Sequence, residues 1–296
     1  MGTFRASAIL AGFFGLTVPL MPVQALLIRL SPSAARRFPH WYHRQVCRLM
    51  GVRLSIDGEI AAGRPVLLIS NHTSWLDIPV LSAVAPVSFV AKKDVARWPF
   101  VSSLARLQRT VFVDRERRTA VGETTNEIMT RLATGDTVVL FAEGTSSDGN
   151  RVLPFKTSLF AAAKPPAKAA GADEGAATAE VAVQTLSLVY THLHGIPLGR
   201  SARPGVGWYG DMEMQSHAWE LLKSGPLDVR IHISPPMPLD SFSDRKDLAR
   251  RTEDAVRQSV VKMLRNRPMD AALEVSAPAA EARTAARPKS GGATFR

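Results

Sequence analysis

Short apolar runs bounded by turn residues recur along the chain between residues 50 and 235. Such runs predict β-strands, because a strand that is buried on both faces is apolar throughout and ends where Gly, Pro or polar residues begin. Seven segments fit this pattern: Val52–Ile56, Val66–Ser70, Val87–Ala91, Thr110–Val113, Thr137–Phe141, Val183–Tyr190 and Asp228–Ile233. Helical stretches separate them, so the predicted fold class is α/β, with a mixed, largely parallel sheet flanked by helices.

Helical periodicity is clearest in two stretches. Val121, Ile128 and Leu132 fall on one helical face, and Gly135 suits the end of that helix. Apolar residues from Val256 to Leu264 repeat at helical spacing and predict a helix that faces the core.

The N-terminal segment is apolar and uncharged from Ala6 to Ile28, a run of 23 residues. As a helix it is long enough to cross a bilayer core, although Pro19 and Pro22 are expected to kink or break it. We therefore predict that residues 1–30 form a hydrophobic, helical membrane anchor that either spans or half-inserts. A cleaved signal peptide, ending near Pro22–Ala25, and a buried core helix are the alternatives.

Charge is distributed unevenly along the chain. The whole chain carries a net charge of +11, and the segments 29–64 and 92–118 carry a net +5 each. Positive charge that directly follows an apolar segment favours the cytoplasmic side of the inner membrane and attraction to anionic lipid headgroups. The single cysteine, Cys47, excludes an intramolecular disulfide and a Cys-rich zinc site. A nucleic-acid partner is not expected, because neither an RNA-binding motif nor a zinc finger is present.

The composition is that of a globular protein, with 46% hydrophobic and 21% charged residues. We predict one domain over residues 31–267, with a mobile surface insertion at 161–180, where Ala, Pro, Gly and Lys dominate. Residues 268–296 are rich in Ala, Pro and Arg, and their apolar residues show no regular spacing. They are predicted to be a disordered tail.

The strongest chemical signal is His72 followed five residues later by Asp77. The two side chains can meet if His72 lies in a strand-to-helix turn and Asp77 lies in the first helical turn. A carboxylate that accepts one ring N–H would fix the imidazole tautomer and leave the other nitrogen free to take a proton from a hydroxyl. The alternative is structural, because Ser74 and Asp77 also have the spacing of a helix capping box.

Two weaker signals follow along the chain. Glu143, Gly144 and Thr145 stand at a strand end, where a tight turn can present polar groups to a ligand, and Lys156 follows them. Arg115 follows the run that contains Phe112, and arginine suits bidentate capture of a phosphate or a carboxylate.

Together, these blocks resemble the glycerolipid acyltransferase family, which includes bacterial 1-acylglycerol-3-phosphate acyltransferases. His72 and Asp77 match the H-x4-D block, Phe112 and Arg115 match the F-x-x-R block, and Glu143–Thr145 match the E-G-T block. The chain departs from the family at three positions, where Arg109 replaces Gly, Ser146 replaces Arg and Thr185 replaces Pro.

The resemblance implies transfer of a fatty acyl group from an acyl-carrier-protein or acyl-CoA thioester to the hydroxyl of a lyso-lipid. His72 would be the general base and Asp77 would orient it. Phe112, Arg115, Glu143, Gly144, Thr145 and Lys156 would bind substrate, and no metal or cofactor is expected. By alternation His192 and His194 would share one strand face, but neither has a Cys or carboxylate near it in sequence, so a zinc site is not expected.

The acceptor is predicted from two of these departures, Arg109 and Ser146, and from further segments such as Trp41–Arg44 and Trp208–Asp211. These resemble the proteobacterial branch that contains lyso-ornithine lipid O-acyltransferases, so lyso-ornithine lipid is favoured and 1-acylglycerol-3-phosphate is the second or additional acceptor. Two other classes stay open: a secreted His/Asp-dependent hydrolase, and a membrane-tethered nucleic-acid-binding protein.

Overall fold

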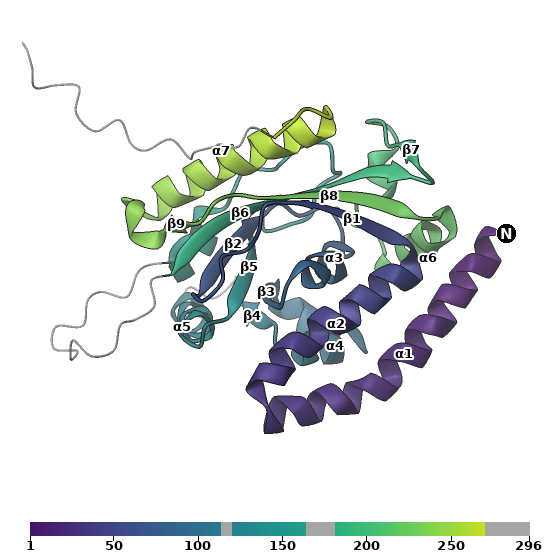
Figure 1. The fold of residues 1–296 in the computed structure, drawn as a ribbon, viewed down its shortest axis with the longest axis horizontal. Coiled ribbons are helices and arrows are strands. Elements are labelled where there is room, and N and C mark those ends of the chain that lie inside the picture. The colour runs from purple at the N-terminus through teal and green to yellow at the C-terminus, as the bar shows by residue number, and fades with distance from the viewer. Residues whose placement is uncertain (114–119, 164–180, 270–296) are drawn as a thin grey trace, which may run out of the picture.

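A single mixed sheet organises the computed structural model, which describes residues 1–113, 120–163 and 181–269 (Figure 1). The strands along the sheet are, in order, β1 (Val52–Asp57), β8 (Leu227–Ile233), β6 (Ala182–Leu193), β2 (Val66–Ser70), β5 (Thr137–Phe141), β3 (Val87–Lys92) and β4 (Val111–Val113). The short strands β7 (Ile196–Pro197) and β9 (Met237–Pro238) pair antiparallel with β6, as β8 does. The other pairings are parallel, so the predicted mixed, largely parallel sheet is confirmed.

Helices cover both faces of this sheet. One face carries α1 (Gly2–Leu30), α2 (Pro32–Met50), α3 (Asp77–Val84) and α6 (Met214–Ser224), and α4 (Val101–Leu107) packs beside α1. The opposite face carries α5 (Ala120–Ala133) and α7 (Arg245–Leu264) (Figure 1). Short 3-10 helices occur at η1 (Lys93–Arg97), η2 (Thr157–Ala163), η3 (Arg203–Gly205) and η4 (Leu239–Ser241).

The core is divided in two by the sheet, because alternate residues of a strand point to opposite faces. In β2, Leu68 belongs to the core beneath α2 and α3, whereas Leu67 and Ile69 belong to the core beneath α5 and α7. Every residue of β2 is buried, which explains why its sequence is apolar throughout instead of alternating. The central strands therefore form a rigid support for the loops that follow them.

The predicted apolar helix at the N-terminus packs against the rest of the protein. Ala6 and Ile9 join the core, and the Gln24 Nε2 donates to the carbonyls of Ala35 and Leu107 at 3.0 and 2.9 Å. The helix continues through Pro19 and Pro22, so these prolines do not break it. The Thr17–Tyr42 hydroxyl contact and the Gln24 bonds tie the helix to α2 and α4 on both sides of the prolines, and this packing offsets the lost backbone bonds.

The predictions for the insertion and the tail fall largely outside the described residues. Residues 161–163 end η2, and residues 164–180 are not described. The tail is described only as far as Met269.

Candidate active site

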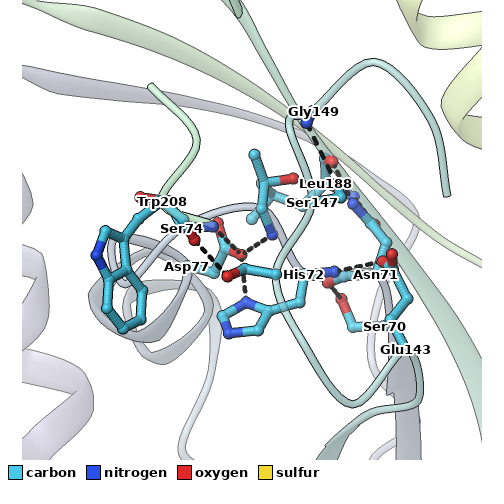
Figure 2. A network of polar contacts seen from close by, with 12 residues as sticks. Ser70, Asn71, His72, Ser74, Asp77, Glu143, Ser147, Gly149, Leu188 and Trp208 are labelled. Carbon is cyan, nitrogen blue, oxygen red and sulfur yellow. Dashed lines mark hydrogen bonds and ion pairs between the residues drawn. The ribbon is translucent and has the colours of Figure 1, made fainter. Parts of the chain in front are cut away.

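The polar residues singled out from sequence meet at one edge of the sheet. Strands β2 and β5 are parallel, and Ser70 and Phe141 are register partners at their carboxyl ends. The loops that follow them therefore lie side by side, which brings His72 next to Glu143. Figure 2 shows His72 with Asp77 and Ser74 on one side and Glu143 on the other.

The structure brings His72 and Asp77 together. His72 lies in the turn after β2, and Asp77 is the first residue of α3. The His72 Nδ1 and the Asp77 Oδ2 are 2.8 Å apart, and the side chains are 18% and 1% exposed. The carboxylate is thus shielded from water while the imidazole reaches the surface.

Asp77 accepts four hydrogen bonds. Its Oδ2 receives the His72 ring and the backbone N–H groups of Thr73 and Ser74, the last two at 2.6 and 3.0 Å. Its Oδ1 receives the hydroxyl of Tyr190 at 2.6 Å. Four donors stabilise the charged form of a buried carboxylate without a cation.

The capping-box interpretation is partly met. Asp77 does accept from the Ser74 N–H, but the Ser74 Oγ has no hydrogen-bond partner among the described residues, and Leu76 is the residue that precedes the helix. The bond to an imidazole lies outside a capping box, so Asp77 does more than begin α3.

The arrangement suits proton transfer at the exposed side of the ring. Since a carboxylate accepts from Nδ1, that nitrogen carries the hydrogen and Nε2 keeps a lone pair. The ring stacks on Phe141, with centroids 4.0 Å apart and planes at 20°, so its orientation is fixed from two sides.

Glu143 is fully buried and braces the site through the backbone. Its Oε1 accepts the His72 N–H at 2.8 Å, and its Oε2 accepts the Leu153 N–H at 2.7 Å. Burial raises the pKa of this carboxyl to about 8, against the two hydrogen bonds, which lower it. The two oxygens of its carboxyl group therefore hold the loop of His72 in place.

The remaining predicted ligand-binding residues are spread over a wider area. Gly144 has a φ of +70°, which the turn after β5 requires, and Thr145 and Lys156 are exposed. Phe112 lies on β4, three strands from β2, which is about 14 Å at the usual strand spacing. Arg115 lies outside the described residues.

Two of the departures from the family pattern have different surroundings. Arg109 pairs with Asp136 at 2.7 Å, and Asp136 precedes β5 whereas Glu143 follows it. The five-residue strand puts Arg109 about 17 Å from the His72 edge. Ser146, by contrast, is close to the site, since its hydroxyl donates to the Trp208 carbonyl and the neighbouring Ser147 N–H donates to the His72 carbonyl.

His192 and His194 do not share a strand face, contrary to expectation, because β6 ends at Leu193. His194 follows β6 with a φ of +54°, and His192 contacts Thr191 and the Asp228 carboxylate. Within the described ranges, no three His, Cys, Asp or Glu side chains cluster in a way that could hold a metal ion.

Sequence reasoning missed several residues that hold the site. Tyr190 bonds to Asp77, the Trp208 N–H donates to the Thr73 carbonyl, and the Asn71 amide exchanges two hydrogen bonds with the Leu188 backbone. Asn71 directly precedes His72, which was a usable signal. Tyr190 and Trp208 are more than 100 residues away along the chain, and no spacing pattern connects them to His72.

Comparisons with known proteins agree with this geometry. A family described as Acyltransferase matches residues 51–169, which contain His72, Asp77 and Glu143. A lyso-ornithine lipid O-acyltransferase of Brucella abortus is 48% identical over 257 residues, covering 87% of this chain and 94% of the relative. The chain belongs to the glycerolipid acyltransferase family. It is an O-acyltransferase of the branch that resembles lyso-ornithine lipid O-acyltransferases.

More distant relatives extend the likeness. A 1-acyl-sn-glycerol-3-phosphate acyltransferase of Neisseria meningitidis is 30% identical, covering 75% of this chain and 83% of the relative. The crystal structure of a 1-acyl-sn-glycerophosphate acyltransferase from Thermotoga maritima superposes with a TM-score of 0.61 at 22% identity, over 91% of this acyltransferase and 97% of that chain. At this identity the structural match supports the fold alone.

Proposed function

We propose that this acyltransferase moves a fatty acyl group from an acyl-carrier-protein or acyl-CoA thioester to the free hydroxyl of lyso-ornithine lipid. The observation that carries the proposal is the His72–Asp77 pair, with Nδ1 held by a buried carboxylate and the ring edge exposed. 1-Acylglycerol-3-phosphate is the second acceptor, since relatives of both names cover most of the chain.

The reaction follows from the tautomer of His72. Its Nε2 takes the hydroxyl proton, and the acceptor oxygen attacks the thioester carbonyl carbon as the proton leaves. The tetrahedral intermediate collapses with cleavage of the C–S bond, and the imidazolium returns its proton to the departing thiolate. Asp77 stabilises the imidazolium between the two steps. Direct attack needs no enzyme nucleophile, in keeping with Cys47, whose thiol pKa burial raises to about 12.

Acceptor binding is proposed for Gly144, Thr145 and Lys156, which follow β5 near the His72 loop. Phe112 on β4, and Arg115, three residues later in the sequence, are proposed as further contacts of the acceptor. In this proposal Glu143 acts by holding the His72 and Leu153 backbone. Ser146 carries no charge and bonds to a carbonyl, which suits an acceptor without a phosphate.

Membrane attachment is proposed for α1, with the catalytic domain over residues 31–267 on the cytoplasmic side of the inner membrane. The helix is long and apolar enough to cross a membrane. One side of it packs on the protein through Ala6, Ile9 and Gln24, which favours half-insertion. Large apolar side chains stay exposed on α1 and midway along α2: Phe4, Phe14, Val18, Val23, Leu26, Ile28, Leu30 and Trp41. Acyl-thioester donors are available on the cytoplasmic side, where the basic residues 29–64 would meet anionic headgroups.

The test is acyl transfer by the purified full chain in anionic vesicles, with lyso-ornithine lipid and lysophosphatidate as separate acceptors. We expect diacylated product from lyso-ornithine lipid, and a fall of about 10²- to 10⁴-fold in kcat for His72→Ala. Free fatty acid is measured in parallel, because a hydrolase would release it without needing an acceptor.

A matched control is His232→Ala. His232 also pairs with a carboxylate, Asp57, at 2.8 Å, but it faces the opposite side of the sheet from Ile231 and Ile233. We expect it to keep wild-type turnover. Equal activity of His72→Ala and the wild type would contradict the proposed mechanism. Formation of product only with lysophosphatidate would contradict the proposed acceptor.

A further inference from the structure

Tyr190 is a buried hydroxyl on β6 that bonds directly to the carboxylate beside His72. It is 4% exposed, and its Oη donates to the Asp77 Oδ1 at 2.6 Å. It reaches Asp77 from a strand, whereas His72, Thr73 and Ser74 belong to the loop that precedes α3. Tyr190 thus ties the carboxylate to the rigid centre of the sheet.

The two carboxylate oxygens of Asp77 differ in the number of hydrogen bonds that they accept. The Oδ2 has three, from His72, Thr73 and Ser74, whereas Tyr190 is the only donor to Oδ1 among the described residues. Since the Asp77 side chain is 1% exposed, water cannot readily replace this hydroxyl. A buried carboxylate oxygen without a donor loses solvation and can rotate toward another partner.

The hydroxyl stays protonated, so it is always the donor. Burial, and then the negative charge of Asp77, raise the pKa of Tyr190 well above 10. The other titratable groups facing Tyr190 and Asp77 are His72, Glu143 and the Cys47 thiol. Cys47 stays neutral near pH 7 because burial raises the pKa of its thiol to about 12.

We propose that Tyr190 is a positioning residue for catalysis, which fixes the Asp77 carboxylate so that Oδ2 faces the His72 ring and draws part of the carboxylate charge to Oδ1. The inference rests on the proposed role of His72 as general base. Tyr190 lies behind Asp77 and does not contact the exposed edge of the imidazole, so it acts through Asp77 and not on substrate. Its loss should alter turnover and pH dependence and leave substrate binding unchanged.

The experiment compares Tyr190→Phe with the wild type in the vesicle assay. We expect kcat to fall about ten-fold while the KM values for donor and acceptor stay within about two-fold. The acidic limb of the kcat–pH profile should move to higher pH by about half a unit or more. Without the hydroxyl, the full charge of Asp77 acts on His72 and favours the protonated ring.

Two further variants separate positioning from stability. Tyr42→Phe removes another tyrosine hydroxyl, which lies on α2 and bonds to a neutral partner, the Thr17 hydroxyl of α1. This variant should leave kcat and the pH profile unchanged. In an Asp77→Asn background, Tyr190→Phe should lower kcat by less than about two-fold more, because both changes act through the same carboxylate.

The outcomes distinguish this proposal from the function itself. A Tyr190→Phe enzyme that has a lowered midpoint of thermal unfolding, but the wild-type kcat and pH profile, would overturn the positioning role while acyl transfer stands. Additive losses in the double variant would also overturn it, as would a rise in KM with kcat unchanged. Absence of acyl transfer in the wild type would contradict the proposed function instead.

Discussion

Replacement of Asp77 by asparagine removes the charge beside His72 and keeps the shape of the side chain. The amide oxygen can still accept from the His72 ring and from the Thr73 and Ser74 N–H groups, which all bond to one carboxylate oxygen. The amide nitrogen then faces Tyr190, whose hydroxyl can turn and accept. The variant is therefore expected to fold, and its main defect is electrostatic.

The size of the defect follows from the geometry. With Nδ1 and Oδ2 at 2.8 Å, the centres of charge of the imidazolium and the carboxylate are about 4 Å apart. At an effective dielectric constant of about 20, this attraction amounts to about 4 kcal/mol. Since about 1.4 kcal/mol corresponds to ten-fold in rate, Asp77→Asn should lower kcat by about 10³-fold.

The assay measures kcat with saturating acceptor together with the midpoint of thermal unfolding. Ser74→Ala is the matched control, because the Ser74 Oγ is buried without a partner among the described residues and its loss should affect neither quantity strongly. If Asp77→Asn lowered the unfolding midpoint and left kcat within about three-fold of wild type, the capping role would be sufficient and the general-base mechanism would be refuted.

Further predictions concern Glu143, the exposed side of α1 and Arg109. In Glu143→Gln, the amide accepts only one of two backbone N–H groups, so urea unfolding should show a loss of about 1–3 kcal/mol. Because the folded pKa of Glu143 is raised from 4.5 to about 8, the wild type should lose stability as pH rises through this window and the variant should not. Exchange of the exposed Phe14 and Leu26 for serine should weaken vesicle binding in sedimentation, leaving salt-sensitive binding to anionic lipid. Arg109→Gly should leave the ratio of kcat/KM for the two acceptors unchanged, because its partner Asp136 lies at the far end of β5.

Much of the fold could be predicted from the sequence because burial on both faces produces continuous apolar runs. The strands β2 and β5 match the predicted segments Val66–Ser70 and Thr137–Phe141 at both ends. The prediction was poorer for β6, which continues past Tyr190 to Leu193, with a shift in its register against β8 between Tyr190 and His192. The last residues of this strand are partly exposed, so the apolar pattern stops before the hydrogen bonding does.

The site could be predicted only where its residues are close in sequence. His72 and Asp77 meet because five residues connect a strand end to a helix start, a local geometry that spacing can reveal. Tyr190 joins them only because β6 pairs with β2, and a tyrosine within an apolar strand does not differ from a core residue. The packing of α1 was hidden for a related reason, since Gln24 is one polar residue in a long apolar helix and its partners lie on α2 and α4.

The three departures from the family pattern have separate physical accounts. Arg109 keeps a φ of +62°, the region that glycine adopts without strain, and its charge is paired with Asp136. Thr185 provides an N–H that proline lacks, and this N–H donates to the Ser234 hydroxyl at 2.8 Å. The charge of Arg109 and the backbone N–H of Thr185 thus both have partners inside the protein. Ser146 alone stands beside the loop of His72, where an arginine would add charge and break the bond to Trp208. The choice between an ornithine and a phosphate headgroup is therefore expected to depend on position 146 and not on position 109.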